Sequence, residues 1–279
     1  MTQSPLSGVK DAQWRWAHNA GLHVNDQGYL PSVEQNIFDR LSDDVRDEFG
    51  RADGAELKDR EHRPAKMRSL ISSSALAVNV FQHWKLNDPA PIGRALGLPS
   101  AATKIAFEKR MRTGAGGTPP NLDVVIRTAE GGIVGVESKF TEWMTRKTGQ
   151  AASMAPYFRK PETLWGRAGL TECERLARDI KDGKKAYEHL DAPQLLKHIL
   201  GLQNQKARPW ALLYVWYDAE GEAGKVHRDE LADFHSRVGA ALTFRAISYQ
   251  SVGKALSVEA QDSPDYLAYL KVRYALGTN

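Results

Sequence analysis

Two neighbouring apolar segments that carry charged residues at fixed places constrain the fold of this chain most. Residues 121–128 contain Asp123, and residues 133–140 contain Glu137 and Lys139. Valine, isoleucine and leucine dominate the rest of both segments, which is typical of strands buried within a sheet. Charged side chains are rarely buried without a partner or a metal ion, so these three residues are the first candidates for a functional site.

The turn between the two segments predicts how they pair. Residues 129–131 include a glycine and have the length of a hairpin loop that joins two antiparallel strands. With this loop, Thr128 pairs with Gly132, and Asp123 lies opposite Glu137. The sequence therefore predicts two carboxylates on neighbouring strands within a few ångströms of each other.

A lysine belongs to the same predicted site. Lys139 lies on the same face as Glu137, because side chains alternate along a strand. Two carboxylates can hold a hard divalent cation, and a lysine beside them can orient or polarise a water molecule. Such a site suits the hydrolysis of a phosphodiester. The alternative is a solvated strand on which Glu and Lys form only a surface ion pair.

The remaining chain predicts an α/β fold, in which a central mixed sheet of four or five strands has helices on both faces. Strands are expected at 103–111, 121–128, 133–140, 210–217 and 242–249, and helices at 33–49, 70–84, 171–189, 193–202, 228–238 and from 264. We expect an N-terminal helical extension (1–65), a core (66–219), and a C-terminal strand and helices that complete the same domain (220–279).

These segments resemble the PD-(D/E)XK nuclease superfamily, which has the restriction-endonuclease-like fold. The resemblance covers roughly residues 68–218 and follows the superfamily's order of helix, three strands, helix and strand. It extends to a closer group of bacterial restriction-endonuclease-like proteins, and it rests on residues 72–81, 107–110, 122–125 and 136–142.

The resemblance implies roles for individual residues. Asp123, Glu137 and Lys139 match the three signature positions. Glu108, at the end of the first predicted strand, matches a further acidic position in the closer group. Leu122 stands where the motif's name has proline, at a position that varies in the superfamily.

The predicted cofactor is Mg²⁺, with Mn²⁺ as a substitute, because acids without a cysteine suit a hard cation. Asp123 and Glu137, with Glu108, would hold one or two ions, and the backbone at Ser138 would add a carbonyl ligand. In the superfamily, a glutamine on the helix beside the catalytic strands often faces the metal. Gln194 is the candidate here, and a surface glutamine is the alternative.

Charge is distributed unevenly along the chain. The formal net charge is +4, yet residues 34–63 carry ten acids against six lysines and arginines, and residues 139–185 carry eleven lysines and arginines against six acids. A basic surface around an acidic centre suits a nuclease, because it attracts phosphates broadly. The predicted nucleic-acid contacts are Arg110, Arg112, Arg146, Lys147, Arg159 and Lys160. A solvated helical face with mixed charges is the alternative.

Several other classes of protein are disfavoured. Cys173 is the single cysteine, so no intramolecular disulfide and no cysteine-based zinc site is possible. The eight histidines lack the spacings of a histidine-rich metal centre, and the fingerprints of dinucleotide and triphosphate binding are absent. No apolar stretch has the length of a membrane span, so we expect a cytoplasmic protein that does not enter the membrane.

The sequence thus predicts a Mg²⁺-dependent deoxyribonuclease. It does not separate DNA from RNA, or endonuclease from exonuclease, and it leaves a homodimer open. Two alternatives remain, in which the acid–lysine cluster serves only as an ion-pair network. One is a non-catalytic nucleic-acid-binding module on the same fold, and the other is an interaction protein in a defence system.

Overall fold

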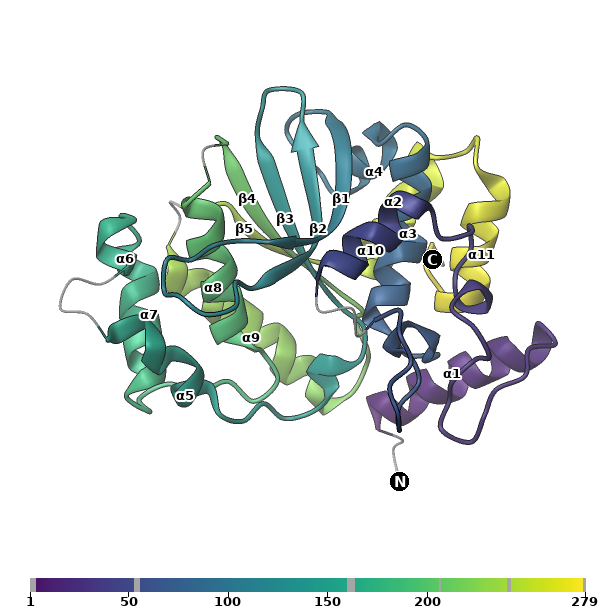
Figure 1. The fold of residues 1–279 in the computed structure, drawn as a ribbon, viewed down its shortest axis with the longest axis horizontal. Helices are drawn as coiled ribbons and strands as arrows, with labels where there is room; N and C mark the ends of the chain where they lie inside the picture. Colours follow the sequence, from purple (N-terminus) through teal and green to yellow (C-terminus); the bar gives the residue numbers. More distant parts are fainter. Residues whose placement is uncertain (1–3, 53–55, 160–163, 206, 240–241, 278–279) are drawn as a thin grey trace.

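The computed structural model describes residues 4–52, 56–159, 164–205, 207–239 and 242–277. A single five-stranded sheet lies between two layers of helices (Figure 1). Its strands are β1 (Ala102–Arg110), β2 (Asn121–Thr128), β3 (Ile133–Lys139), β4 (Trp210–Trp216) and β5 (Phe244–Ser248). They lie side by side in chain order. Strand β2 is antiparallel to both β1 and β3, whereas β3, β4 and β5 are parallel, so the predicted mixed sheet is confirmed.

Helices cover both faces of the sheet, as predicted, and each face has its own apolar cluster. One cluster packs α2 (Asp43–Arg51), α3 (Ser73–Leu86), α4 (Ala90–Ala95), α10 (Tyr249–Glu259) and α11 (Pro264–Tyr274). The other packs α5 (Gln150–Met154), α6 (Leu164–Arg167), α7 (Thr171–Lys181), α8 (Ala192–Gln203) and α9 (Glu222–Val238). Alternate residues of β4 enter different clusters, as the period of a strand requires.

The N-terminal segment contributes to the first of these clusters. Helix α1 (Pro5–Asn19) begins at a serine cap with a proline in its first turn, and it places Val9 in the core. Phe49 of α2 stacks on Phe107 of β1, with ring centroids 5.9 Å apart. No helix in the part of the chain that the structure describes is long and apolar enough to cross a membrane.

Three predicted helices have different bounds in the structure. The helix expected at 33–49 is wrong in its first half, where a short 3-10 turn (Glu34–Asn36) precedes α2. A side chain of α3 interrupts it, since Asn79 Oδ1 accepts a hydrogen bond from Phe38 N at 2.7 Å. The helix expected at 171–189 ends at Lys181, because Gly183 adopts a positive φ of 71°. Helix α9 begins at Glu222 rather than at residue 228, and α4 and α10 were not predicted.

The predicted hairpin register is confirmed. Thr128 N donates to Gly132 O at 3.1 Å, and Gly131 N donates to Thr128 O at 3.0 Å, so residues 129–131 form the loop. Gly131 has a positive φ of 78°, which a residue without Cβ adopts at little cost. From here the ladder runs to the pair Val124–Val136, one residue short of the predicted carboxylate pair.

Candidate active site

Glu137 lies at the centre of the candidate site. Its side chain is completely buried on β3, and it has a base on either side. Lys139 Nζ contacts Oε1, and Nε2 of His198 on α8 lies 2.9 Å from Oε2. Burial by itself raises the pKa of Glu137, but the charges of Lys139 and His198 outweigh it and lower the pKa to about 2. Glu137 is therefore ionised throughout the physiological range.

Asp123 lies beside Glu137 with the opposite shift. Its Oδ2 accepts a hydrogen bond from Ser138 N at 2.7 Å, so its carboxylate lies against the backbone one residue beyond the predicted partner. Burial, followed by the negative charge of Glu137, raises the pKa of Asp123 well above its usual value. Two carboxylates in one site thus have their pKa values pushed apart, which is typical of acid–base and metal sites.

Lys139 completes the predicted trio. Burial alone lowers the pKa of this ammonium, but the carboxylates of Glu137 and Asp123 outweigh that effect and raise the pKa well above its usual value. The side chain of Lys139 is 14% exposed, whereas that of Glu137 is not exposed at all. The lysine is therefore a charged group that reaches from a buried carboxylate toward solvent.

Glu108 lies on β1, which neighbours the strand that carries Asp123. Lys109 pairs with Leu122 and Phe107 with Val124, so the position of Glu108 in the register is opposite Asp123. Its φ of 50° lies in the left-handed region, which is unusual for a residue with a side chain. Glu108 also accepts a hydrogen bond from Asn121 Nδ2 at 3.2 Å, and its charge adds to the raised pKa of Asp123.

His198 was not identified from the sequence as a site residue. It lies one turn after Gln194 on α8, so the two side chains share a helix face. The side chain of Gln194 is partly buried. Its backbone N donates a hydrogen bond to Oδ1 of the cap residue Asp191 at 3.1 Å. The sequence contains one signal for His198. It follows the candidate Gln194 by four residues on a mostly apolar helix, and this spacing places both side chains on one face.

Ser138 faces away from the carboxylates. Its hydroxyl lies 2.6 Å from the hydroxyl of Tyr249, on α10 and thus on the other side of the sheet. Its backbone N is the group that contacts Asp123. A ligand role through the hydroxyl of Ser138 is therefore unsuitable, and only its backbone carbonyl stays a prediction.

The predicted nucleic-acid contacts are spread over the surface. Arg112 and Arg159 are exposed, and Lys160 lies outside the described residues. Arg110 is exposed too, and it donates to the backbone oxygen of Ala52 at 2.9 Å. Arg146 and Lys147 also have partners within the chain. Arg146 Nε lies 2.9 Å from Glu188 Oε1, and Lys147 Nζ donates to Glu142 O at 2.6 Å. Burial and then the charge of Lys139 lower the pKa of Lys147.

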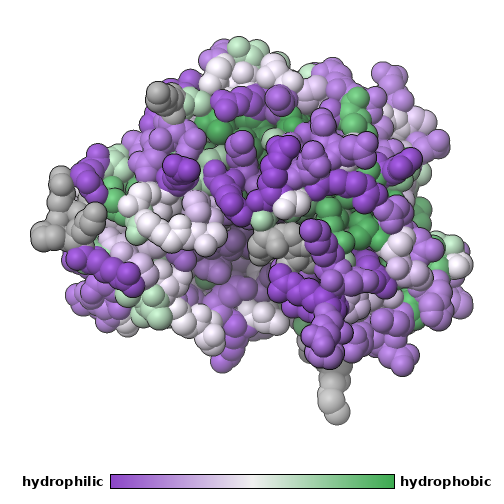
Figure 2. Space-filling view, viewed as in Figure 1, coloured by the Kyte–Doolittle hydropathy of each residue, from purple (hydrophilic) through white to green (hydrophobic). Residues whose placement is uncertain are grey.

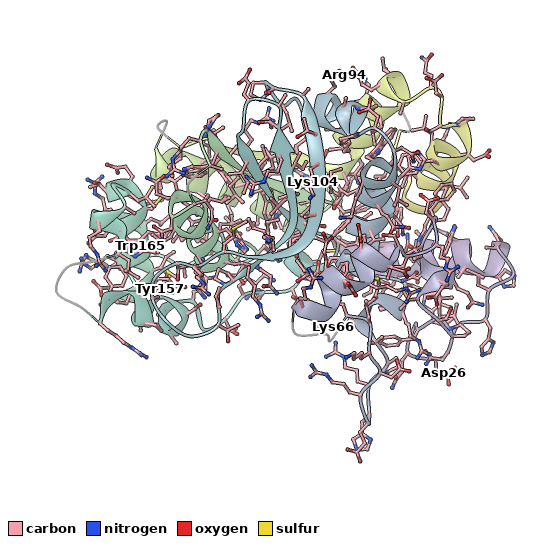
Figure 3. All side chains as sticks on the ribbon, turned by 45° about the horizontal axis from the view of Figure 1, so that its top comes forward. Asp26, Lys66, Arg94, Lys104, Tyr157 and Trp165 are labelled. Carbon is pink, nitrogen blue, oxygen red and sulfur yellow. The ribbon has the colours of Figure 1, made fainter. Side chains whose placement is uncertain are left out.

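The aromatic side chains among these cations pack in the interior. Trp143 and Trp165 are completely buried, and Tyr157 and Phe158 pack against the same cluster. Figure 3 shows Tyr157 and Trp165 among α5, α6 and α7. Arg178 lies over the ring of Phe158, 4.9 Å from its centroid. These aromatic residues therefore pack against the core and do not form a stacking platform for bases.

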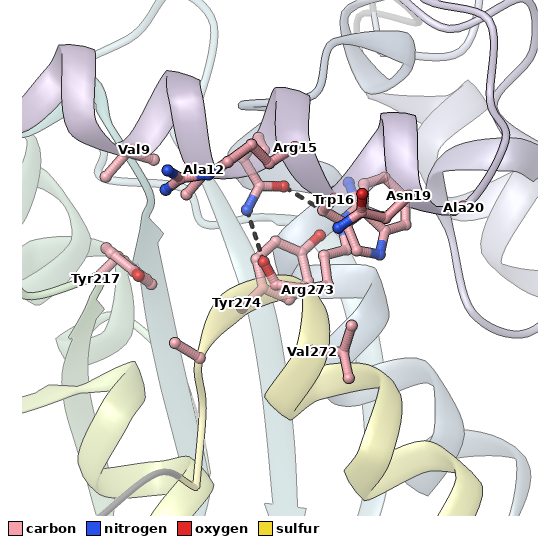
Figure 4. Close-up of a pocket in the computed structure, with 12 residues that line it drawn as sticks. Val9, Ala12, Arg15, Trp16, Asn19, Ala20, Tyr217, Val272, Arg273 and Tyr274 are labelled. Atoms are coloured by element: carbon pink, nitrogen blue, oxygen red, sulfur yellow. Dashed lines mark hydrogen bonds between the residues drawn. The ribbon is translucent and has the colours of Figure 1, made fainter.

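The surface over this part of the molecule is mostly hydrophilic. Figure 2 shows mainly hydrophilic residues across this face, with smaller apolar patches between them. A separate cavity of about 410 Å³ lies between α1 and α11, where Trp16, Tyr217 and Arg273 line it (Figure 4). Neither Asp123, Glu137 nor Lys139 lines this cavity, so it is distinct from the candidate site.

The carboxylates at the site are sufficient for a cation that takes few protein ligands. Within the described ranges, no group of three or more His, Cys, Asp or Glu side chains comes close enough together to form a metal cage. Mg²⁺ usually takes only one or two carboxylates and keeps several waters, and Asp123 and Glu137 provide two. Burial, followed by the charge of Glu137, raises the pKa of Asp123, and a bound cation would favour the ionised form against both effects. Neither oxygen of Glu137 has a well-aligned hydrogen bond from a described residue.

Comparison with known proteins agrees with this architecture. A family model, REase-ARP, described as "Restriction Endonuclease associating with ARP", matches residues 9–275. Searches of curated proteins and of solved structures gave no match. The matched range contains the whole sheet and every candidate site residue, and the five-stranded mixed sheet between helices is consistent with a restriction-endonuclease-like core. The chain therefore belongs to the REase-ARP family of restriction-endonuclease-like proteins.

Proposed function

We propose that this chain is a divalent-metal-dependent nuclease of the PD-(D/E)XK type that hydrolyses phosphodiester bonds in DNA. One observation carries the proposal, namely the buried carboxylate of Glu137 with Lys139 against it and Asp123 beside it on the neighbouring strand. The family description as a restriction endonuclease supports this reaction and a DNA substrate. Burial of charged groups within a core lowers the stability of the fold, and such groups are typical of functional sites.

The residues of the candidate site have different proposed roles. Asp123 and Glu137 would hold Mg²⁺, for which Mn²⁺ would substitute, and Glu108 would add negative charge beside them. When bound, the cation supplies Lewis-acid stabilisation of charge on the phosphoryl oxygens. Lys139 binds and orients the attacking water through its ammonium group. Gln194 faces the same helix side as His198 and would contact the water shell.

A plasmid assay tests the proposed activity. Purified protein with Mg²⁺ should nick or linearise supercoiled plasmid DNA, and EDTA should abolish the cleavage because the carboxylates alone do not stabilise the transition state. Agarose gel electrophoresis measures the conversion, and an RNA substrate of equal length distinguishes the two nucleic acids. Cleavage that persists in excess EDTA would contradict the metal assignment.

A non-catalytic nucleic-acid-binding module is the second candidate. The favouring observation is that Lys139 Nζ and His198 Nε2 lie against the two oxygens of Glu137, so protein groups occupy this carboxylate. The family description also names an association with ARP, so an interaction protein belongs to this second class. Tight DNA binding without cleavage at any divalent metal concentration would favour the module over the enzyme.

The basic residues at the end of β1 provide a test of DNA binding. Replacing Arg110 and Arg112 by alanine should weaken DNA binding for all sequences, because both are exposed beside Glu108. The slope of log affinity against log salt should fall by about 0.9 for each lost phosphate contact. Fluorescence anisotropy across a salt series measures both quantities.

A matched control removes the same charge at the other end of the same strands. Lys104 and Arg127 are exposed and pair across β1 and β2, and Figure 3 shows Lys104 on β1 near α4. Lys104 is six residues from Arg110, which is roughly 20 Å along a strand. The double alanine variant at Lys104 and Arg127 should keep the wild-type salt slope. Equal slopes for the two double variants would place the DNA elsewhere.

A further inference from the structure

Burial of His198 in the core lowers the stability of the fold. It is completely buried on α8, where its helix neighbours in the same apolar cluster are Leu195, Ile199 and Leu202. Its Nδ1 has no hydrogen-bond partner among the described residues. A buried polar nitrogen without a partner destabilises a fold, and a leucine at this position would avoid that cost. The contact that distinguishes histidine from leucine here is the one with Glu137.

The short distance in that contact implies a hydrogen between the two atoms. Nε2 of His198 lies 2.9 Å from Oε2 of Glu137, and both side chains are inaccessible to solvent. Two lone pairs at this distance would repel each other in a medium of low polarity. His198 therefore carries its hydrogen on Nε2, the ring nitrogen that lies against this oxygen, although the contact is not a well-aligned hydrogen bond.

Three of the four carboxylate oxygens at the site thus have protein partners. Oε1 of Glu137 contacts Lys139, Oε2 faces His198, and Oδ2 of Asp123 accepts from Ser138 N at 2.7 Å. A ligand would use Oδ1 of Asp123 and Oε1 of Glu137, because the lysine at Oε1 is flexible and partly exposed, whereas the histidine at Oε2 is completely buried. One oxygen from each carboxylate suits a single cation that keeps several waters, whereas two cations about 3.5–4 Å apart would need more oxygen ligands.

We propose that His198 is a positioning residue, which fixes one oxygen of Glu137 so that the other is presented, together with Asp123, to a single divalent cation. The ligand in this proposal rests on the proposed function, whereas the contact between His198 and Glu137 does not. His198 acts through Glu137 and touches neither the cation nor the DNA. A partner that orients a metal ligand in this way usually affects metal affinity more than it affects folding.

Binding of Mn²⁺ in the absence of DNA tests the proposal without reference to cleavage. The full-length protein is titrated with Mn²⁺, and electron paramagnetic resonance measures the free ion. The wild type should bind one Mn²⁺ per chain, and His198→Leu should bind it about 10–100-fold more weakly. His198→Gln should recover most of the affinity, because its amide can donate to the same carboxylate oxygen.

A second buried histidine provides the matched control. His227 is also completely buried, but its Nε2 lies 3.1 Å from the hydroxyl of Tyr214, and it forms no ion pair with a carboxylate of the described residues. His227→Leu should keep wild-type Mn²⁺ affinity even where its melting temperature falls. Unchanged affinity in His198→Leu, or equal losses in His198→Leu and His227→Leu, overturns the positioning role, and two Mn²⁺ per wild-type chain overturns the single cation.

A double-mutant cycle separates failure of this proposal from failure of the proposed function. The melting temperatures of His198→Leu, Glu137→Gln and the double variant are measured in EDTA. Non-additive changes support the contact, and additive changes overturn it. If the wild type binds no Mn²⁺, the metal-dependent function is rejected together with the single cation, and the cycle alone decides whether His198 holds Glu137.

Discussion

Lys139→Ala is expected to reduce the rate of DNA cleavage by about two to four orders of magnitude, the scale of removing one positioned proton-transfer or electrostatic group. The ammonium of Lys139 lies against Glu137 and is kept charged by that carboxylate and by Asp123. The carboxylates and the basic surface remain in the variant, so DNA affinity should stay close to the wild-type value. Single-turnover cleavage under saturating enzyme measures the chemical step separately from binding.

Two further variants make this result specific. Lys139→Arg should not restore the rate, because a guanidinium is longer, planar and directed differently. Lys85→Ala removes a lysine of similar burial, whose Nζ lies 3.0 Å from Glu48 Oε1 and contacts neither Glu137 nor Asp123, and it should cleave at the wild-type rate once folded. Wild-type cleavage by Lys139→Ala would show that the Glu-x-Lys arrangement is not catalytic.

Asp123→Asn is expected to lower cleavage at least about 100-fold, as the loss of one preorganised electrostatic group does, while the free protein becomes more stable at neutral pH. The substitution keeps the volume of the side chain and removes a negative charge that lies beside Glu137. Calorimetric titration should show weaker Mg²⁺ binding. Unchanged Mg²⁺ affinity would remove Asp123 from the metal site.

The gain in stability has a definite dependence on pH. The folded pKa of Asp123 lies well above its usual value, so the ionised carboxylate opposes folding once the pH exceeds the unfolded pKa of about 3.9. The difference in melting temperature between Asp123→Asn and the wild type should be near zero below pH 4. It should grow as the pH rises above the unfolded pKa and level off above the folded pKa. Melting curves in EDTA from pH 4 to pH 8 measure it.

A second aspartate gives the opposite sign and serves as the control. Asp59 accepts a hydrogen bond from Ala65 N at 2.7 Å and contacts Arg68, and both lower its pKa. Its carboxylate contributes stability above the unfolded pKa, and this contribution is lost as the pH falls through the folded pKa. Asp59→Asn should therefore lower the melting temperature at neutral pH. The same sign for both variants would contradict the assigned shifts.

The sequence by itself determined the sheet and the strand positions of Asp123, Glu137 and Lys139. Strand periodicity is local, and a three-residue glycine loop leaves one register that keeps the apolar faces buried, as the bond from Thr128 to Gly132 confirms. Helix bounds were less determined, because Asn79 of α3 takes the backbone of Phe38 out of the predicted helix.

Only the tertiary structure decided what surrounds the carboxylates. The packing of α8 on β3 brings His198 against Glu137. The ladder between β2 and β3 ends at the pair Val124–Val136, and the side chain of Asp123 beyond it accepts from the backbone of Ser138. The sequence reveals which residues can carry charge, since that is a property of each side chain. It does not reveal which charges meet, because contacts between distant segments depend on how whole elements pack, and the pKa values follow from those contacts.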